Sequence, residues 1–268
     1  MSPLDELFAR TRVEGRAALI GYLPAGFPTV EGGLEAVRAM VAAGADAVEV
    51  GVPYSDPLMD GPTIQAAAER ALAGGTRMAD VFRTVSAVAS AGGVALVMTY
   101  WNPVERYGVD AFARDLAAAG GSGVITPDII PEEAGEWLAA AAAYDLDPVF
   151  LVAPSSTEAR VQRVAAASRG FVYAASTMGV TGAREQTSSL APGLVARVRA
   201  VSDLPVCVGL GVASGDQAAE VAGYADGVIV GSALVRCLLD APSAAEGLAS
   251  LTALVRDLAD GVRAPAAD

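Results

Sequence analysis

Residues 47–65, AVEVGVPYSDPLMDGPTIQ, contain a strand and a loop from which the organisation of the whole chain can be worked out. The first six residues alternate in the manner of a strand, because successive side chains of a strand point to opposite faces. Three valines share one face, and Glu49 lies on the other face between Ala47 and Gly51. The sequence therefore predicts a carboxyl group in an apolar strand, with space beside it.

Two acidic residues converge on the end of this strand. Pro53 ends the strand, and the loop that follows carries Asp60. Burial raises the pKa of an unpaired carboxyl group, so a buried Glu49 is a candidate general acid and base near neutral pH. The alternative for Glu49 is a solvated edge strand, which the flanking valines argue against. For Asp60 two interpretations stay open, a second site carboxylate or an ordinary turn residue before glycine.

The composition is that of a globular protein with an acidic surface. The chain has 268 residues, of which 53% are hydrophobic and 18% charged, and its net charge is −13. This length suits one large α/β barrel or two small domains. The negative charge disfavours nucleic acid and anionic membranes as partners. Because the N-terminus does not resemble a signal peptide and no apolar run is long enough to span a membrane, we expect a cytoplasmic protein.

Two absences from the sequence and its low cysteine content restrict the chemistry. The chain has no histidine and no lysine, so all 18 basic residues are arginines. A lysine Schiff base, and with it covalent attachment of pyridoxal phosphate to this chain, is therefore excluded. The two cysteines, Cys207 and Cys237, lie in an expected strand and helix, where we expect buried thiols and no zinc site.

A strand followed by a helix recurs along the chain. Eight apolar strands are predicted at residues 17–22, 47–52, 95–100, 123–127, 148–153, 171–175, 206–210 and 227–230. Helices are predicted at residues 2–12, 29–44, 76–91, 109–119, 131–144, 157–167, 191–201 and 214–221, with another beginning at Ala233.

Eight apolar strands joined by helices indicate a parallel sheet covered on both sides, which in about 250 residues is the size of a TIM (β/α)8 barrel. We predict α/β class and one TIM-barrel domain over residues 1–268, with an extra N-terminal helix at about 2–12 and a flexible tail at about 263–268. The alternative is an open doubly wound sheet. That fold favours a glycine-rich fingerprint after the first strand, which residues 21–26 do not match.

The C-terminal ends of the strands carry the candidate site residues, because barrel enzymes place their active sites there. Tyr100, Asp128 and Tyr173 join Glu49 at this end. Core packing is the alternative for each tyrosine, and capping of the following helix is the alternative for Asp128.

Glycines at the ends of the last two strands indicate a phosphate site. Residues 209–211 read Gly-Leu-Gly, and Gly231 and Ser232 lead into a helix. Glycine lets backbone N–H groups approach a phosphate closely, and a helix N-terminus favours its negative charge. The loop at residues 179–184, with two glycines, is placed to close over a ligand.

Taken together, these segments resemble a known family. Residues 48–65 closely resemble the signature of the tryptophan synthase alpha subunit, and further likeness lies at residues 23–28, 100–103, 179–182, 209–211 and 231–233. The resemblance spans nearly the whole chain. The sequence departs from common members of the family at Gly21, at Ile130 and at Thr177 with Met178.

The resemblance implies a lyase of tryptophan biosynthesis that cleaves indole-3-glycerol phosphate to indole and glyceraldehyde 3-phosphate by a retro-aldol step. Glu49 would be the acid/base that protonates the indole ring at C3, and Asp60 would bind the indole N–H. The substrate would be contacted by Tyr22, Met98, Tyr100, Ile125, Tyr173 and Thr181. The phosphate would be held by Gly182, Gly211, Gly231 and Ser232.

The resemblance also implies a partner, a tryptophan synthase beta subunit, in an α2β2 tetramer. Pyridoxal phosphate is expected in that partner, and no cofactor or metal is expected in this chain. Two other hypotheses remain. The first is a regulatory subunit that keeps the barrel only to activate a beta partner, and the second is another phosphosugar enzyme. Phosphosugar enzymes of this fold, such as indole-glycerol phosphate synthase and triosephosphate isomerase, are expected by resemblance to use a lysine. This chain has no lysine.

Overall fold

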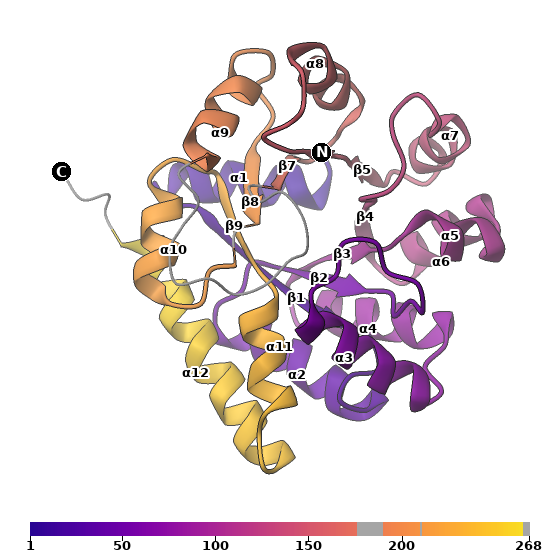
Figure 1. Cartoon of the computed structure of the whole chain (residues 1–268), viewed down its shortest axis with the longest axis vertical. Helices are drawn as coiled ribbons and strands as arrows, with labels where there is room; N and C mark the ends of the chain where they lie inside the picture. The colour runs from indigo at the N-terminus through magenta and orange to yellow at the C-terminus, as the bar shows by residue number, and fades with distance from the viewer. Residues whose placement is uncertain (176–189, 210, 265–268) are drawn as a thin grey trace.

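The computed structural model describes residues 1–175, 190–209 and 211–264, which form a ring of strands surrounded by helices (Figure 1). The strands are β1 (Ala18–Pro24), β2 (Ala47–Gly51), β3 (Val94–Met98), β4 (Gly121–Ile125), β5 (Asp147–Val149), β6 (Leu151–Val152), β7 (Val172–Ala175), β8 (Val206–Gly209) and β9 (Gly227–Val230). The helices are α1 (Pro3–Val13), α2 (Val30–Ala43), α3 (Pro62–Ala73), α4 (Met78–Ser90), α5 (Trp101–Tyr107), α6 (Val109–Ala118), α7 (Gly135–Ala143), α8 (Glu158–Ala167), α9 (Ala191–Arg199), α10 (Gly215–Ala222), α11 (Ser232–Leu239) and α12 (Ala244–Arg263).

All strand pairs are parallel, and their order closes the sheet. The order is β5-β4-β3-β2-β1-β9-β8-β7-β6, which places β5 and β6 at the two edges. Only Phe150 separates β5 from β6 in the chain, so the two edges belong to one interrupted strand and the sheet forms a barrel. Counted in this way, the barrel has the eight predicted strand positions. The predicted TIM barrel with an extra N-terminal helix is confirmed.

Local sequence signals fix the ends of the first two helices. Ser2 caps α1 through its hydroxyl and the Asp5 amide, and the Asp5 carboxylate in turn accepts from the Ser2 amide at 2.9 Å. Thr29 caps α2, and Gly44 ends it in the left-handed conformation with φ of 116°. Reciprocal capping and a left-handed glycine satisfy backbone groups that a helix end leaves unpaired.

Two hydrophobic clusters divide the interior. One cluster lies between the helices and the outer face of the barrel, and includes Val48 and Val50 of β2. The other fills the barrel itself, and includes Ala47 of β2 and Leu96 of β3. Three residues of α1 belong to this inner cluster: Leu4, Leu7 and Phe8. Helix α1 therefore covers the end of the barrel at which the strands begin.

Some helix boundaries differ from the prediction. Helix α7 begins at Gly135 and not at residue 131, because residues 130–134 form turns in which Glu133 and Ala134 donate to carbonyls three residues earlier. Helices α3, α5 and α12 were not delimited by the sequence patterns. The last helix includes Arg263, and residues 265–268 of the expected tail lie outside the described residues.

Three further sequence observations are tested by the fold. Cys207 is fully buried in β8 and Cys237 is half-buried in α11, and both thiols are free, as predicted. At Gly21, a Cβ atom would lie 2.3 Å from Cε of Met40, so the small residue makes room for that side chain. Among the described helices, none combines the length and the apolar character needed to cross a bilayer.

Candidate active site

Glu49 lies inside the barrel near the C-terminal end of β2. It alternates with Val48 and Val50, which face outward, and its side chain therefore points inward with that of Ala47. Its neighbours in register are Tyr22 on β1 and Leu96 on β3. The residue is only 1% exposed. The structure thus places the carboxyl group where the alternation of β2 predicted it.

The environment of Glu49 favours its protonated form. Its Oε1 atom has no hydrogen-bond partner among the described residues. Burial raises the pKa of Glu49 to about 8, because removal from water penalises the charged carboxylate. A carboxyl group with this pKa is mostly protonated at pH 7, and it can give a proton and then take one back.

Two tyrosines reach across neighbouring strands close to Glu49. A Cβ atom on Gly51 would lie 2.3 Å from the Tyr22 hydroxyl oxygen, and one on Gly209 would lie 2.5 Å from that of Tyr173. Burial raises the pKa of both phenols well above 10, and the negative charge of Glu49 contributes to both shifts. Both hydroxyls therefore stay protonated, and each occupies space that only a glycine leaves open.

Asp60 is held by Tyr100, a residue 40 positions away in the chain. The Tyr100 hydroxyl donates to Oδ1 of Asp60 at 2.9 Å and accepts from the Met59 amide at 2.9 Å. Burial raises the pKa of Asp60, and the hydrogen bond from Tyr100 partly opposes this shift. Burial also raises the pKa of Tyr100 to about 12. The side chain of Asp60 is therefore fixed by a tertiary contact and does not merely shape a turn.

Met98 and Ile125 line the inside of the barrel at the C-terminal ends of β3 and β4. They end β3 and β4 and are partners in register, and Met98 is also the partner of Gly51. Both belong to the inner hydrophobic cluster. They supply an apolar wall at the level of the strand ends where Glu49 and the tyrosines lie.

The described glycines of the predicted phosphate site lie at the same end of the barrel. Gly211 follows β8 and has φ of 68°, a conformation that favours glycine. Gly231 follows β9 and precedes α11, whose first residue is Ser232. A Cβ atom on Gly231 would lie 3.6 Å from Cβ of Tyr22, so this helix N-terminus adjoins the site. Thr181, Gly182 and the rest of the loop at 176–189 lie outside the described residues.

Asp128 caps a helix, but not the following one that was the alternative to a site role. Both of its carboxylate oxygens accept from the Trp101 amide, at 2.9 and 3.0 Å. Trp101 is the first residue of α5, so Asp128 caps a helix that precedes it in the chain. The reason is that the strand ends β3 and β4 are neighbours in the barrel, which brings Asp128 to α5.

Sequence reasoning also missed a contact between Tyr54 and Asn102. Asn102 donates from Nδ2 to the Tyr54 hydroxyl at 2.9 Å, and the ring centroid of Tyr54 lies 5.4 Å from that of Tyr100. These residues connect the loop that carries Asp60 to α5. No local pattern reveals the contact, because its partners are 48 positions apart and belong to different elements.

Comparisons with known proteins agree with this geometry. The family model "Tryptophan synthase alpha chain" matches residues 8–263. The tryptophan synthase alpha chain of Nocardia farcinica is 64% identical over 262 residues, covering 98% of this chain and 96% of that protein. The alpha chain of Salinispora arenicola is 64% identical over 266 residues, covering 99% of this chain and all of that protein. A chain from the structure of Mycobacterium tuberculosis tryptophan synthase superposes with a TM-score of 0.93 at 61% identity, covering 98% of this chain and 99% of that one.

Proposed function

Because this chain belongs to the tryptophan synthase alpha chain family, we propose a role for each described site residue in the reaction of that family. The reaction is the retro-aldol cleavage of indole-3-glycerol phosphate to indole and glyceraldehyde 3-phosphate, a carbon–carbon lyase step in tryptophan biosynthesis. The observation that supports the assignment is the buried carboxyl group of Glu49 near the C-terminal end of β2 inside the barrel, with its pKa raised to about 8.

Glu49 acts first as the acid. Its carboxyl group, mostly protonated at pH 7, donates a proton to C3 of the indole ring, and the ring nitrogen then carries a positive charge. The resulting carboxylate takes the proton of the adjacent glycerol hydroxyl as the carbon–carbon bond breaks. The electrons of that bond neutralise the ring and the hydroxyl carbon becomes an aldehyde, so Glu49 ends protonated as it began.

Asp60 stabilises the charge that develops on the ring. Its carboxylate accepts the indole N–H, and the hydrogen bond from Tyr100 keeps it oriented before the substrate arrives. Preorganised electrostatic groups of this kind are worth about 10² to 10³ in kcat. Substitution of Asp60 by Asn is therefore expected to lower kcat by about 100-fold.

The remaining residues bind the two ends of the substrate. Met98 and Ile125, with the rings of Tyr22, Tyr100 and Tyr173, form the indole pocket and exclude water from the protonated ring. Gly211 after β8, with Gly231 and Ser232 at the start of α11, hold the phosphate through backbone N–H groups, together with Thr181 and Gly182 of the loop. Backbone N–H donors suit a chain that has no lysine or histidine, because arginine is its only cationic side chain.

Family membership implies a beta subunit as partner. We extend this to an α2β2 tetramer in the cytoplasm, in which only the beta subunit carries pyridoxal phosphate. The absence of lysine from this chain is consistent with that division, since no residue is available for the Schiff base. The chain itself acts as one domain without a cofactor or a metal.

Indole release from indole-3-glycerol phosphate by the purified chain tests these assignments, measured alone and with the beta subunit added. We expect slow release that accelerates with the partner, and a loss of at least about 10³-fold in Glu49→Gln. The exposed Glu35→Gln on α2 is the matched control and is expected to retain full activity. A fully active Glu49→Gln variant would disprove the assignment, and activation of the beta subunit without any indole release would indicate a regulatory subunit.

A further inference from the structure

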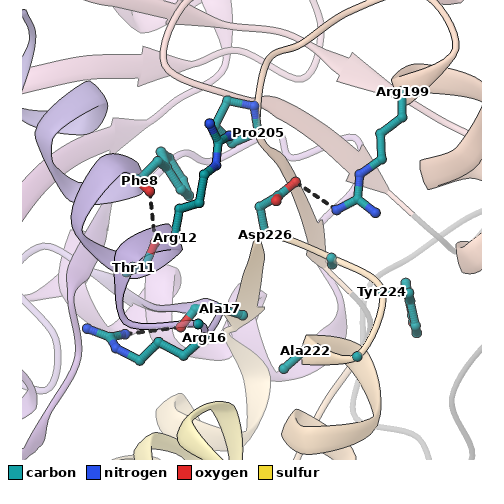
Figure 2. A pocket seen from close by; sticks show the side chains of 13 residues that line it. Phe8, Thr11, Arg12, Arg16, Ala17, Arg199, Pro205, Ala222, Tyr224 and Asp226 are labelled. Atoms are coloured by element: carbon teal, nitrogen blue, oxygen red, sulfur yellow. Dashed lines mark hydrogen bonds and ion pairs between the residues drawn. The ribbon is translucent and has the colours of Figure 1, made fainter. Parts of the chain in front are cut away.

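A cavity of about 270 Å³ lies at the end of the barrel opposite Glu49 and Asp60 (Figure 2). Its walls come from α1 and the loop leading into β1, from the end of α9, and from the segments that enter β8 and β9. These are the N-terminal ends of the strands, and the proposed reaction takes place at the C-terminal ends. The cavity is therefore unused by the lyase reaction, and binding there does not depend on the roles proposed above.

Arg12 on α1 brings an unpaired positive charge to this cavity. Its guanidinium has no ion pair and no hydrogen bond among the described residues, and the side chain is exposed. A cation in the last turn of a helix is favoured by the helix dipole. The helix dipole explains why a cation is favoured at this position. It does not explain why the Arg12 side chain extends across the cavity toward Pro205 (Figure 2).

Arg199 at the end of α9 provides a second guanidinium with unused donors. Its Nη2 donates to Oδ2 of Asp226 at 3.0 Å, and the Val206 amide donates to the same oxygen at 2.9 Å. A guanidinium has five N–H donors, so this single bond leaves most of them available. Figure 2 shows Arg12 and Arg199 on the two sides of Asp226.

Arg16, the third arginine of the cavity wall, adds no available charge. It is only 8% exposed and pairs with Glu14 at 2.5 Å and with Asp46 at 2.7 Å. Asp226 is the only acidic residue among those that line the cavity. Two accessible guanidiniums beside one carboxylate therefore leave a net positive site on a chain whose total charge is −13.

Apolar side chains form the smaller part of the cavity wall. The ring of Phe8 is buried at the back of the cavity on the same side of Asp226 as Pro205, whereas the half-buried Tyr224 lies on the other side, with Arg199 (Figure 2). The cavity is smaller than the sites that hold drug-sized ligands, which measure about 300 to 1,000 Å³. Its size and lining suit a small molecule with one charged end and one flat end.

We propose that this cavity binds a small organic anion whose carboxylate group is attached to a flat apolar body. The carboxylate lies at the mouth of the cavity, where the free donors of Arg12 and Arg199 supply charge-assisted hydrogen bonds. The apolar body lies against Pro205 and the edge of Phe8. Because such a ligand binds the folded chain, it stabilises the barrel at the end that α1 covers.

Titration of benzoate into the 15N-labelled full-length chain tests the proposal by NMR. We expect benzoate to shift the amides of Gly15 and Gly223, which line the cavity. Arg12→Ala and Arg199→Ala are each expected to weaken benzoate binding by about tenfold. Arg38→Ala, which removes an exposed arginine of α2 outside the cavity, is the matched control and is expected to leave the affinity unchanged.

Inorganic phosphate is the second probe and separates a carboxylate site from a site that recognises charge alone. Weaker binding of phosphate than of benzoate at the same amides supports the proposal. Equal affinity for phosphate overturns the role of the apolar wall. Shifts confined to Gly51 and Gly231 at the other end of the barrel, no shift up to about 20 mM benzoate, or equal affinities in the Arg12→Ala and Arg38→Ala variants overturn the site itself.

Discussion

Glu49 carries two properties that a surface glutamate lacks, a pKa of about 8 and a position inside an apolar barrel. The position causes the raised pKa, because it removes the carboxyl group from water. The same burial that keeps the carboxyl group of Glu49 protonated at neutral pH must cost stability when the group ionises. The chemistry of this residue is therefore coupled to the pH dependence of folding.

The sign of this coupling follows from the direction of the shift. The pKa of Glu49 in the folded chain lies above the ordinary value of 4.5, so the contribution to stability is complete below pH 4.5 and is lost as the pH rises through about 8. Each pKa unit corresponds to about 1.4 kcal/mol, so the shift from 4.5 to about 8 gives a total loss on the order of 5 kcal/mol. Urea unfolding of Glu49→Gln between pH 5 and pH 9 should lack this fall. Glu35→Gln should keep it, and the same fall in Glu49→Gln would contradict the assignment.

At Gly51 the absence of a Cβ atom leaves room for the hydroxyl group of Tyr22. The Cβ atom of Ala at this position would lie 2.3 Å from the Tyr22 hydroxyl oxygen and 2.6 Å from its ring carbon Cζ. We expect Gly51→Ala to displace Tyr22, with a loss of about 1 to 3 kcal/mol in stability and at least tenfold in kcat/KM.

The control for Gly51→Ala is Gly193→Ala in α9, where a Cβ atom would meet nothing within 4 Å. Alanine is the better helix former, so this variant should be as stable as the parent or up to about 1 kcal/mol more stable. Thermal unfolding and indole assays on both variants make the comparison. Equal effects at the two positions would show that the close approach to Tyr22 has no consequence.

At the scale of elements, the loop between β2 and α3 is fixed by Tyr100 at the start of α5. One hydroxyl group holds both the Met59 amide and the Asp60 carboxylate at 2.9 Å. Tyr54 and Asn102 add a second connection between the same loop and α5. The neighbouring strand ends β2 and β3 thus set the orientation of a carboxylate that neither element fixes alone.

Tyr100→Phe removes both hydrogen bonds and keeps the ring. A hydrogen bond to a charged group is worth about 1.5 to 3 kcal/mol, so we expect kcat/KM to fall about 10- to 100-fold. Because Tyr100 opposes the rise in the pKa of Asp60, that pKa should rise further and the acid limb of the pH–rate profile should move to higher pH. Tyr144→Phe, which removes a phenol bonded to Asp110 on the surface, should leave both quantities unchanged.

At the scale of the whole molecule, the two ends of the barrel have separate tasks. The C-terminal ends carry Glu49, Asp60 and the glycines proposed to bind phosphate, and α1 covers the N-terminal ends. Asp46, just before β2, links β2 to β1 and to the loop after α1 at the N-terminal end of the barrel. It accepts from Arg16 at 2.7 and 2.8 Å and from the Leu19 amide at 2.9 Å.

Asp46→Asn should therefore destabilise the entire barrel. Burial by itself would raise the pKa of Asp46, but its hydrogen bonds from Arg16 and Leu19 outweigh burial and lower that pKa. Its contribution is present above the ordinary pKa and is lost as the pH falls through the folded pKa. We expect a loss of about 3 kcal/mol at pH 7, and a smaller loss near pH 3, in urea unfolding.

The control for Asp46→Asn is Glu31→Gln, which breaks an exposed pair with Arg83. Exposed pairs contribute about 0 to 1 kcal/mol, so this variant should unfold with nearly the parental free energy. A similar loss of unfolding free energy in both variants would mean that the buried position of Asp46 contributes no more to stability than an exposed ion pair.

The sequence by itself determined the strand positions, the barrel class and the inward direction of Glu49. These features depend on local periodicity, because alternation in β2 sets which face each side chain takes. It also indicated Gly211, Gly231 and Ser232, since strand ends of a parallel barrel gather at one edge. The break of the fifth strand at Phe150 and the late start of α7 at Gly135 did not follow from periodicity.

Only the tertiary structure decided how the site is held together. The contacts of Tyr100 with Asp60, of Tyr22 with Gly51 and of Asp128 with Trp101 join residues 27 to 40 positions apart. No local pattern encodes such contacts, because they depend on which strands become neighbours when the sheet closes. The pKa of Glu49 has the same origin, since the water around its carboxyl group is removed by the whole barrel and not by the residues beside it in the chain.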